Sequence, residues 1–400
     1  MKSLVGKHIL LAMSGGIAAF KVAELARSLI QEGASVQVAM SDAATQFMTP
    51  VTMQALTGNP VYTSQWDARI ANNMAHIELS RKADLILLAP ASADMMAKIA
   101  LGLADDLIST MCLARECPLV VVPAMNKQMW ENKATQSNIE TLIKNDIQVL
   151  GPTRGTQACG ENGMGRMLEA SQILEGTIAF FQKKTLLGKK ILITAGPTYE
   201  AIDPVRGITN KSSGKMGFAI AQAAVEAGAN VQLISGPCDL ETPLEFTGSI
   251  NRICVESAKE MFSVVMSNLN VDAFFSVAAV ADWGVKNVQA QKIKKTNSNN
   301  PALEFELNPD ILSNVAAHAE KNKKPYCIGF AAETEELEKH ATEKRARKNV
   351  PLLVGNIGPS TFGQNDNELL LIEAKGSSRL PKADKLTLAR QLIAHISTKI

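Results

Sequence analysis

Three polar side chains in the first half of the chain have types and positions that suit proton transfer or substrate binding. His76 lies just before an expected strand, Asn126 lies at the end of another, and Cys159 lies in a glycine-rich stretch, 158–167. Imidazole and thiol groups can both donate or accept a proton in a reaction. A lone histidine is more often structural, whereas a glycine-rich loop has no packing role for a thiol. We therefore interpret Cys159 as a reactive group and His76 as a candidate supported by its context.

A loop of small residues follows the strand expected over 8–13. Small side chains let backbone N–H groups approach a phosphate, and the next helix points its positive end at it. The loop lacks the G-x-G-x-x-G pattern, and no acidic residue ends the second strand, which disfavours a nicotinamide dinucleotide. The hydroxyls of Ser41 and Ser92 suit a mononucleotide such as FMN, although turns of this kind also occur without a ligand. The expected FMN contacts are Ser14, Gly15, Gly16, Ile17, Ser41, Pro90, Ala91 and Ser92.

The second half carries an anion-binding pattern of its own. Ser212, Ser213, Gly214 and Lys215 combine hydroxyls, flexible backbone and a cation where a helix begins, which suits phosphate. The spacing is not that of a Walker A loop, and a polar helix cap is the alternative interpretation. A charged helical run such as 344–348 is more often a solvated face than a site.

Alternating strands and helices must position these residues. In the first half, apolar runs predict strands over 8–13, 36–40, 84–89 and 119–123. In the second half they predict strands over 190–194, 231–235, 273–278, 326–330 and 352–355. Helical spacing marks 18–31, 94–100 and 216–227. This pattern predicts an α/β protein with two Rossmann-like, three-layer domains.

A pair of sequence motifs that occurs in both halves of the chain marks the boundary between the two domains. The motifs at 6–10 and 32–38 reappear at 188–192 and 227–233, as the first two strands of a Rossmann-like unit in each half. We interpret this repetition as evidence of shared architecture and not of common ancestry. A chain of 400 residues also exceeds what one core usually organises. We expect one domain over residues 1–188 and another over 189–400.

Composition excludes several classes of protein. With 46% hydrophobic and 20% charged residues, the chain is globular and neither disordered nor fibrous. Its 41 basic and 39 acidic side chains nearly balance, which argues against binding to nucleic acid or a membrane surface. Six cysteines without a C-x-x-C motif predict neither a disulfide scaffold nor a zinc ribbon. Because apolar runs are too short for a signal peptide or a membrane span, we expect a cytoplasmic protein.

The motifs around His76, Asn126 and Cys159, together with residues 104–107, resemble the flavin-dependent phosphopantothenoylcysteine decarboxylases. The resemblance implies a flavodoxin-like, FMN-binding first domain. It further implies that His76 is the catalytic base, that Asn126 grips the substrate carboxylate, and that Cys159 donates a proton from a mobile flap. The chemistry is consistent, because loss of CO2 from an acylated cysteine needs an electron sink. Oxidation of the sulfur-bearing carbon by FMN supplies one, and the reduced flavin then returns the electrons.

The second half resembles the phosphopantothenate–cysteine ligases, in motifs at 195–217, 278–282, 292–295, 308–311, 329–334 and 343–349. The resemblance implies a nucleotide-binding domain that uses CTP to convert a carboxylate into an acyl-cytidylate, which the amine of cysteine attacks. Asn210 would position that intermediate, and Lys292 would be catalytic. The implied CTP contacts are Ser276, Val277, Ala278, Asp282, Lys292, Asn308, Pro309, Asp310, Ile311, Phe330, Lys344 and Lys348.

Together the two resemblances imply a bifunctional enzyme of coenzyme A biosynthesis. It would join cysteine to 4'-phosphopantothenate in the second domain and decarboxylate the product in the first, giving 4'-phosphopantetheine. Mg2+ would bind with CTP, with Asp282 as a candidate ligand. The family also implies homo-oligomers, in which decarboxylase trimers and ligase dimers build a dodecamer with FMN between subunits.

Two other functions stay open from the residues alone. A tandem nicotinamide oxidoreductase is disfavoured by the missing acid at 40–42. A non-catalytic regulatory flavoprotein would be expected to lose the base or the thiol, yet His76 and Cys159 are both present. The chain departs from the ligase pattern at 283–284, where Trp-Gly replaces an aromatic residue followed by a basic one. No role is assigned to that dipeptide or to the polar run 297–300.

Overall fold

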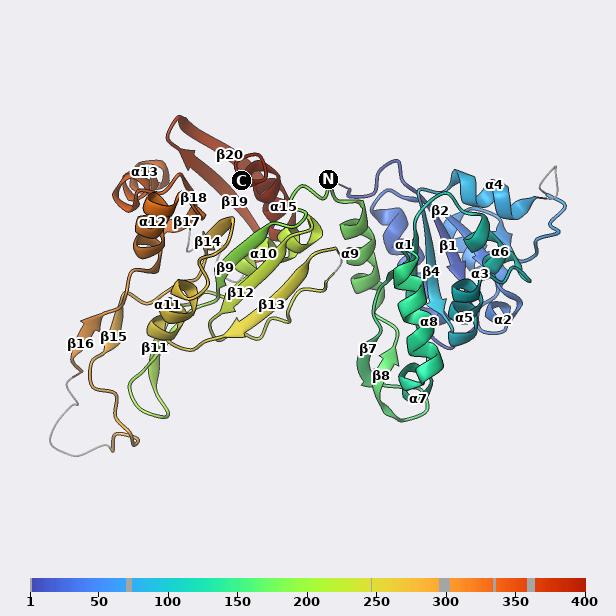
Figure 1. Cartoon of the computed structure of the whole chain (residues 1–400), viewed down its shortest axis with the longest axis horizontal. Helices are drawn as coiled ribbons and strands as arrows, with labels where there is room; N and C mark the ends of the chain where they lie inside the picture. Colours follow the sequence, from blue (N-terminus) through green and yellow to red (C-terminus); the bar gives the residue numbers. More distant parts are fainter. Residues whose placement is uncertain (1, 70–73, 246, 295–302, 334–335, 358–363) are drawn as a thin grey trace. The chain divides into compact units, whose positions relative to one another are not determined.

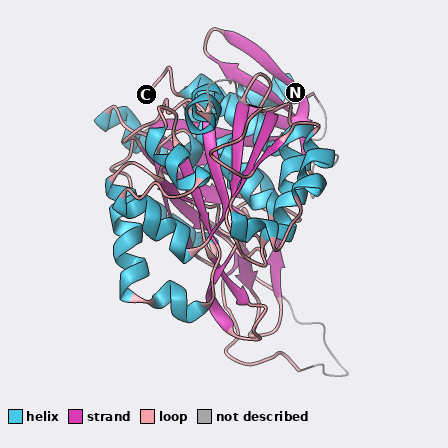
Figure 2. Ribbon diagram, turned by 90° about the vertical axis from the view of Figure 1, so that its right-hand side faces the viewer, coloured by secondary structure: helices cyan, strands magenta, loops and turns pink. Residues whose placement is uncertain are grey.

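The computed structural model describes residues 2–69, 74–245, 247–294, 303–333, 336–357 and 364–400, so the run 297–300 lies outside the described residues. The chain forms two compact units, Met1–Phe181 and Gln182–Ile400 (Figure 1). Residues 182–188, which the sequence assigns to the first domain, belong to the second unit. Helices flank the strands (Figure 2), and the predicted α/β class is confirmed.

The first unit contains a parallel sheet of six strands. Its order is β3 (Val61–Tyr62), β2 (Ser35–Met40), β1 (His8–Met13), β4 (Leu85–Ala91), β5 (Leu119–Pro123) and β6 (Gln148–Val149). This is the Rossmann order 3-2-1-4-5-6, rather than the 2-1-3-4-5 order of flavodoxin itself. The order of the strands reverses between β1 and β4, so the carboxyl ends of these strands border a crevice where ligands bind in such folds.

Two groups of helices cover the first sheet. One consists of α1 (Ala19–Gln31), α3 (Pro50–Thr57) and α9 (Ala170–Phe181). The other shares a core with the sheet and consists of α4 (Ala75–Lys82), α5 (Ala93–Leu101), α6 (Leu107–Ala114) and α8 (Lys133–Lys144). Shorter elements are α2 (Asp42–Thr45), α7 (Lys127–Glu131), and the hairpin of β7 (Thr153–Thr156) and β8 (Asn162–Arg166). The apolar positions that predict α1 form its buried face, including Val22, Leu25 and Leu29.

The second unit contains a sheet of eight strands. Its order is β13 (Ser249–Cys254), β12 (Asn230–Ser235), β9 (Lys190–Ala195), β14 (Ala273–Ser276), β17 (Tyr326–Glu333), β18 (Leu352–Ile357), β19 (Asp366–Glu373) and β20 (Gly376–Asp384). The first six are parallel and the last two are antiparallel. The strand predicted over 273–278 ends early because the Thr194 hydroxyl accepts the N–H groups of Val277 and Ala278, at 3.2 and 3.4 Å.

Helices also cover the second sheet in two groups. One core holds α10 (Lys215–Glu226) and α15 (Lys385–Ile396), and the other holds α11 (Ala258–Met266), α12 (Ile311–Asn322) and α13 (Leu337–Lys348). Two further pairs of antiparallel strands lie outside the main sheet: β10 (Tyr199–Ala201) with β11 (Gly207–Thr209), and β15 (Trp283–Val285) with β16 (Phe305–Leu307). In α10, a Cβ at Gly217 would lie 2.6 Å from the Ala195 Cβ, so only glycine allows this close packing. Within the described ranges, every helix is too short or too polar to cross a lipid bilayer.

Candidate functional sites

A cavity of about 640 Å³ lies at the carboxyl edge of the first sheet. Three segments line it: the loop before α1, the region where α5 and α7 begin, and the β7–β8 hairpin. Predicted residues among the lining are Gly15, Gly16, Ile17, Ser92, Asn126 and Cys159. The volume falls within the range of about 300–1,000 Å³ that is typical of small-molecule sites.

The loop before α1 has the features needed to hold a phosphate. A Cβ at Gly15 would lie 2.6 Å from the Ala43 Cβ, so the loop packs directly against α2. At Gly16 the same position faces open space, which leaves the backbone accessible at the positive end of α1. Apolar side chains form much of the remaining wall: Ile17, Phe20, Met125, Met129 and Met167. Backbone donors beside an apolar wall fit the phosphate and the ring system of FMN.

Four of the predicted FMN contacts do not line this cavity. The buried Ser14 hydroxyl donates to the Pro90 carbonyl at 2.7 Å and accepts the Ser92 N–H at 2.8 Å. The Ser41 hydroxyl caps α2 by accepting the Ala44 N–H at 3.2 Å. Pro90 and Ala91 are buried in β4. These residues fix the shape of the crevice, and Ser92 is the predicted hydroxyl that reaches its surface.

One glutamine side chain brings Asn126 and Cys159 to the same cavity. Asn126 caps α7, its Oδ1 accepting the Met129 N–H at 2.9 Å, and Cys159 lies exposed in the loop of the β7–β8 hairpin. The Gln157 Oε1 accepts the Lys127 N–H at 2.9 Å, which joins the hairpin to the start of α7. The Cys159 thiol lies 3.6 Å from the Glu161 Oε2 and can donate to it. The arrangement places an amide and a thiol beside one ligand space.

His76 is placed differently from these residues. It is the second residue of α4, where the sequence led us to expect a position just before a strand, and it does not line the cavity of its own chain. Its Nδ1 is buried and has no hydrogen-bond partner among the described residues. Residues 72–73 of its motif lie outside the described ranges.

A second cavity, of about 380 Å³, lies at the carboxyl edge of the other sheet. The loop before α10, the loop after β14, β17 and α13 all contribute to it. Predicted residues that line it are Asn210, Ser212, Ser213, Gly214, Lys215, Val277, Ala278, Asp282, Phe330 and Lys344. Among the described lining residues, four are cationic and one is a carboxylate: Lys211, Lys215, Lys344 and Lys385 against Asp282. This balance favours an anionic ligand.

Hydrogen bonds hold the loop before α10 over this cavity. The Asn210 Nδ2 donates to the Ala279 carbonyl at 2.8 Å, which links the loop to the segment after β14. Gly214 caps α10 with a φ of 76°, and a Cβ there would lie 3.3 Å from the Gly196 Cα. A side chain would be strained at this position, because its φ lies in the left-handed region. The loop therefore presents backbone and hydroxyl groups at the start of α10.

The other predicted nucleotide contacts lie outside the lining of the second cavity. Lys348 of α13 forms an ion pair with Asp310, which caps α12 by accepting the Ser313 N–H at 3.0 Å. Burial alone would raise the pKa of Asp310, but Lys348 and Ser313 hold it below the ordinary value. The Asn308 Nδ2 donates to the Ala281 carbonyl at 2.9 Å. Four more predicted contacts are also absent from the described lining of this cavity: Ser276, Lys292, Pro309 and Ile311.

The Trp-Gly departure lies on the β15–β16 hairpin. A Cβ at Gly284 would lie 2.9 Å from the Asn308 Oδ1, so a larger residue here requires the Asn308 side chain to shift. Trp283 is exposed on the same strand.

The one side chain predicted to bind a metal ion is Asp282. The described ranges contain no group of three or more His, Cys, Asp or Glu side chains that could hold a metal ion. Asp282 is a single carboxylate on the wall of the second cavity. One carboxylate suits Mg2+, which usually keeps several waters and shares its coordination with substrate phosphates.

Among the lining residues of the second cavity that the sequence did not predict, two are buried polar residues from the end of the chain. Asn367 and Lys385 are 4% and 8% exposed, and both come from the last elements of the chain. Their types and spacing carry no signal, because only the pairing of β18 with β19 and the packing of α15 bring them to the loop before α10.

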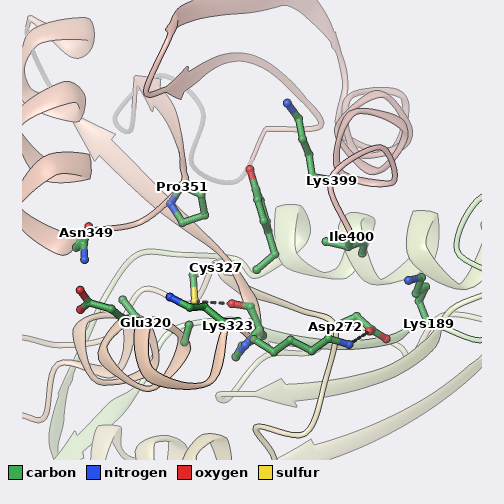
Figure 3. Close-up of a pocket in the computed structure, with 14 residues that line it drawn as sticks. Lys189, Asp272, Glu320, Lys323, Cys327, Asn349, Pro351, Lys399 and Ile400 are labelled. Carbon is green, nitrogen blue, oxygen red and sulfur yellow. Dashed lines mark hydrogen bonds and ion pairs between the residues drawn. The ribbon is translucent and has the colours of Figure 1, made fainter.

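Another cavity, of about 540 Å³, lies at the amino ends of β14 and β17 (Figure 3). Lys189, Lys323, Lys324 and Lys399 line it, and Lys324 is paired with Asp272 at 2.8 Å. Burial raises the pKa of the Cys327 thiol at its floor to about 12. Ligands of doubly wound sheets bind at the opposite, carboxyl edge, so we assign no substrate to this cavity.

Comparisons with known proteins cover both units. A family model named Flavoprotein matches residues 1–182, and a model of the DNA/pantothenate metabolism flavoprotein C-terminal domain matches residues 186–400. The coenzyme A biosynthesis bifunctional protein CoaBC of Vibrio cholerae is 49% identical over 394 residues, covering 97% of each chain. The CoaBC protein of Escherichia coli K12 is 45% identical over 404 residues, covering 99% of this chain and 98% of its own. The solved structure of a mutant PPC decarboxylase, complexed with pantothenoylaminoethenethiol, is 32% identical, covers 44% of this chain and 98% of its own, and gives a TM-score of 0.41.

Proposed function

This chain belongs to the CoaBC family of bifunctional coenzyme A biosynthesis proteins, and from that membership we propose the two reactions it catalyses. The second unit joins cysteine to 4'-phosphopantothenate at the expense of CTP, and the first decarboxylates the product to 4'-phosphopantetheine. The observation that carries this proposal is that each unit brings several of its candidate residues together in one cavity at the carboxyl edge of its sheet. Asn126 and Cys159 meet in the first, and Asn210 and Lys215 meet in the second.

In the decarboxylation, FMN supplies a reversible two-electron sink for the loss of CO2 when it is bound. The loop of Gly15 and Gly16 would hold its phosphate, and the apolar wall of the cavity would hold its ring system. The amide of Asn126 binds the substrate carboxylate before CO2 departs. The Cys159 thiol returns a proton to the product from the β7–β8 hairpin, and His76 acts as the base.

In the ligation, the substrate carboxylate attacks CTP, pyrophosphate leaves, and the acyl-cytidylate is then attacked by the amine of cysteine with release of CMP. Lys215 and Lys344 neutralise charge on the phosphates, and Asp282 would hold the Mg2+ that shares this charge. Asn210 steadies the anhydride from its position beside the loop after β14. Lys292, which lies outside the described lining of this cavity, would be the catalytic lysine.

The decarboxylase site is completed by a neighbouring subunit. Two observations support this part of the proposal: His76 does not line the cavity of its own chain, and Ile17 and Phe20 at the cavity are each 62% exposed. A second copy would bury these apolar side chains and supply a base. Trimers of the first unit and dimers of the second would then build a dodecamer, which acts on small molecules in the cytoplasm.

One incubation tests the proposal. The protein is mixed with 4'-phosphopantothenate, cysteine, Mg2+ and either CTP or ATP, and products are followed by mass spectrometry. We expect 4'-phosphopantetheine and CMP with CTP, and an absorption band of oxidised flavin in the purified protein. A colourless protein that forms no acylated cysteine with either nucleotide would contradict the proposal.

A further inference from the structure

Two helices of the second unit begin with a lysine at the same cavity. Lys215 is the first residue of α10 and Lys385 is the first residue of α15, and both line the cavity. Lys385 is 8% exposed, and its Nζ donates to the Gln364 carbonyl at 2.6 Å. The Lys215 Nζ donates to the Asn365 Oδ1 at 2.8 Å. The two ammonium groups are therefore held by neighbouring residues of one segment.

A lysine at the first position of a helix is unfavourable by itself. The positive end of the helix dipole favours carboxylates at the helix start. The start of α10 has none, whereas α15 is capped by Asp384, whose Oδ1 accepts the Thr387 N–H at 2.9 Å. Burying the ammonium of Lys385 adds a desolvation cost. Burial, together with the neighbouring Lys215, holds the pKa of Lys385 below its ordinary value. An anion bound at the start of α10, between Lys215 and Lys385, would offset the cost of the lysine at this helix start and the cost of burying the Lys385 ammonium.

A buried ion pair fixes the position of Lys385. The helices α10 and α15 pack against each other (Figure 1), and the Arg390 guanidinium binds the Glu226 carboxylate through two hydrogen bonds of 2.7 and 2.9 Å. Glu226 is the last residue of α10 and is fully buried. A planar, two-point contact allows one alignment of the helices. The lysine at the start of α15 is thereby positioned before any ligand binds.

We propose that Lys385 is a phosphate-binding residue of the ligase cavity, which holds one phosphate group of a bound substrate together with Lys215 and the backbone N–H groups at the start of α10. This inference rests on the ligation reaction proposed above. Two substrates of that reaction carry the required chemistry, the nucleotide triphosphate and the phosphate monoester of 4'-phosphopantothenate. The buried Asn367 on the same wall offers a further polar group to either.

The test uses three variants of the full-length chain. Lys385→Met removes the charge and keeps the length of the side chain, whereas Lys385→Arg keeps the charge. The matched control is Lys382→Met, because Lys382 is an exposed lysine that pairs with Asp366 at 2.9 Å and does not line the cavity. Binding of CTP alone and of 4'-phosphopantothenate alone is measured by calorimetry. Ligation is then assayed with 4'-phosphopantothenate and with pantothenate, which lacks the phosphate.

We expect Lys385→Met to weaken the binding of one phosphorylated substrate by about ten- to a hundredfold, the usual range for a hydrogen bond to a charged group. A loss confined to CTP assigns the residue to the triphosphate. A loss confined to 4'-phosphopantothenate, with reduced discrimination against pantothenate, assigns it to the monoester. Lys385→Arg should retain most of the affinity, and Lys382→Met all of it.

Unchanged binding of both substrates to Lys385→Met would overturn the inference, even if the variant melts at a lower temperature. A wild-type protein that binds CTP but does not ligate would instead contradict the proposed function. In that case the CTP and 4'-phosphopantothenate titrations would still decide the role of Lys385.

Discussion

The buried carboxylate of Asp203 accepts the backbone N–H of Ile293 at 3.1 Å, and so fixes the residue next to Lys292. Arg206 strengthens the contact, because its guanidinium pairs with Asp203 and donates to the Ile293 carbonyl at 3.0 Å. The exposed Lys292 lies outside the described lining of the second cavity, while one end of its segment is anchored to the turn between β10 and β11. The contact therefore restrains the backbone of the segment that carries Lys292.

The same contact predicts a change in acid stability. The Arg206 guanidinium and three backbone N–H groups hold the pKa of Asp203 well below its usual range. Because the folded-state pKa is depressed, ionised Asp203 stabilises the protein above its unfolded-state pKa of about 3.9, and this contribution is lost as the pH falls through the folded-state value. Urea unfolding of Asp203→Asn should therefore depend less on pH below about pH 4 than that of the wild type. Curves of equal slope for the two proteins would contradict this.

Removing Arg390 should destabilise the second unit. Glu226 is fully buried, so Arg390→Met removes the guanidinium that pairs with its carboxylate, at a cost of about 3–5 kcal/mol, although the Gln222 Nε2 still donates to it at 3.1 Å. Replacing both partners, in Glu226→Leu with Arg390→Met, should recover most of that loss, since no buried charge remains. Urea titration of the three proteins measures the difference. A double variant no more stable than Arg390→Met would show that the charge is not the cause.

The thiol of Cys159 should matter for only one of the two reactions. Cys159→Ser replaces a proton donor with a weaker acid, and we expect decarboxylation of added 4'-phosphopantothenoylcysteine to slow by about 10²- to 10⁴-fold. Ligation should stay at the wild-type rate. Cys254→Ser is the matched control, because Cys254 is an exposed free thiol of the second unit. Equal activity in the two variants would exclude Cys159 as the donor.

A site shared between subunits predicts complementation. His76→Asn and Cys159→Ser should each be inactive in decarboxylation when assembled alone. Oligomers co-assembled from equal amounts of the two variants should regain about a quarter of the wild-type rate, because that share of sites combines an intact histidine with an intact thiol. Mixtures that stay inactive after verified co-assembly would place both residues in one chain's site.

The sequence predicts the framework of both sites better than it predicts individual contacts. Apolar runs locate strands such as β1 and β5 within a residue, because burial in a parallel sheet leaves a strong pattern. The role of a serine hydroxyl cannot be predicted from its position after a strand. Ser41 caps α2, whereas Ser92 both caps α5 and lines the cavity. His76 lies in α4, whereas its local sequence predicted a position just before a strand.

Contacts that depend on packing between distant elements have no local signal. The ion pair of Lys348 with Asp310 joins α13 to α12, and it occupies two residues that the motifs assign to the nucleotide. Lys385 reaches the second cavity only through the packing of α15 against α10. Such residues become visible once the order of the strands and the faces covered by the helices are known.

The most direct test of the two-reaction account is to separate the reactions with one variant in each unit. His76→Asn and Lys292→Gln are each given 4'-phosphopantothenate, cysteine, Mg2+ and CTP, and then 4'-phosphopantothenoylcysteine alone. We predict that His76→Asn accumulates the acylated cysteine without releasing CO2. Lys292→Gln should form none of it, yet decarboxylate the added compound at the wild-type rate. If either variant lost both activities while remaining folded, the assignment of one reaction to each unit would be wrong.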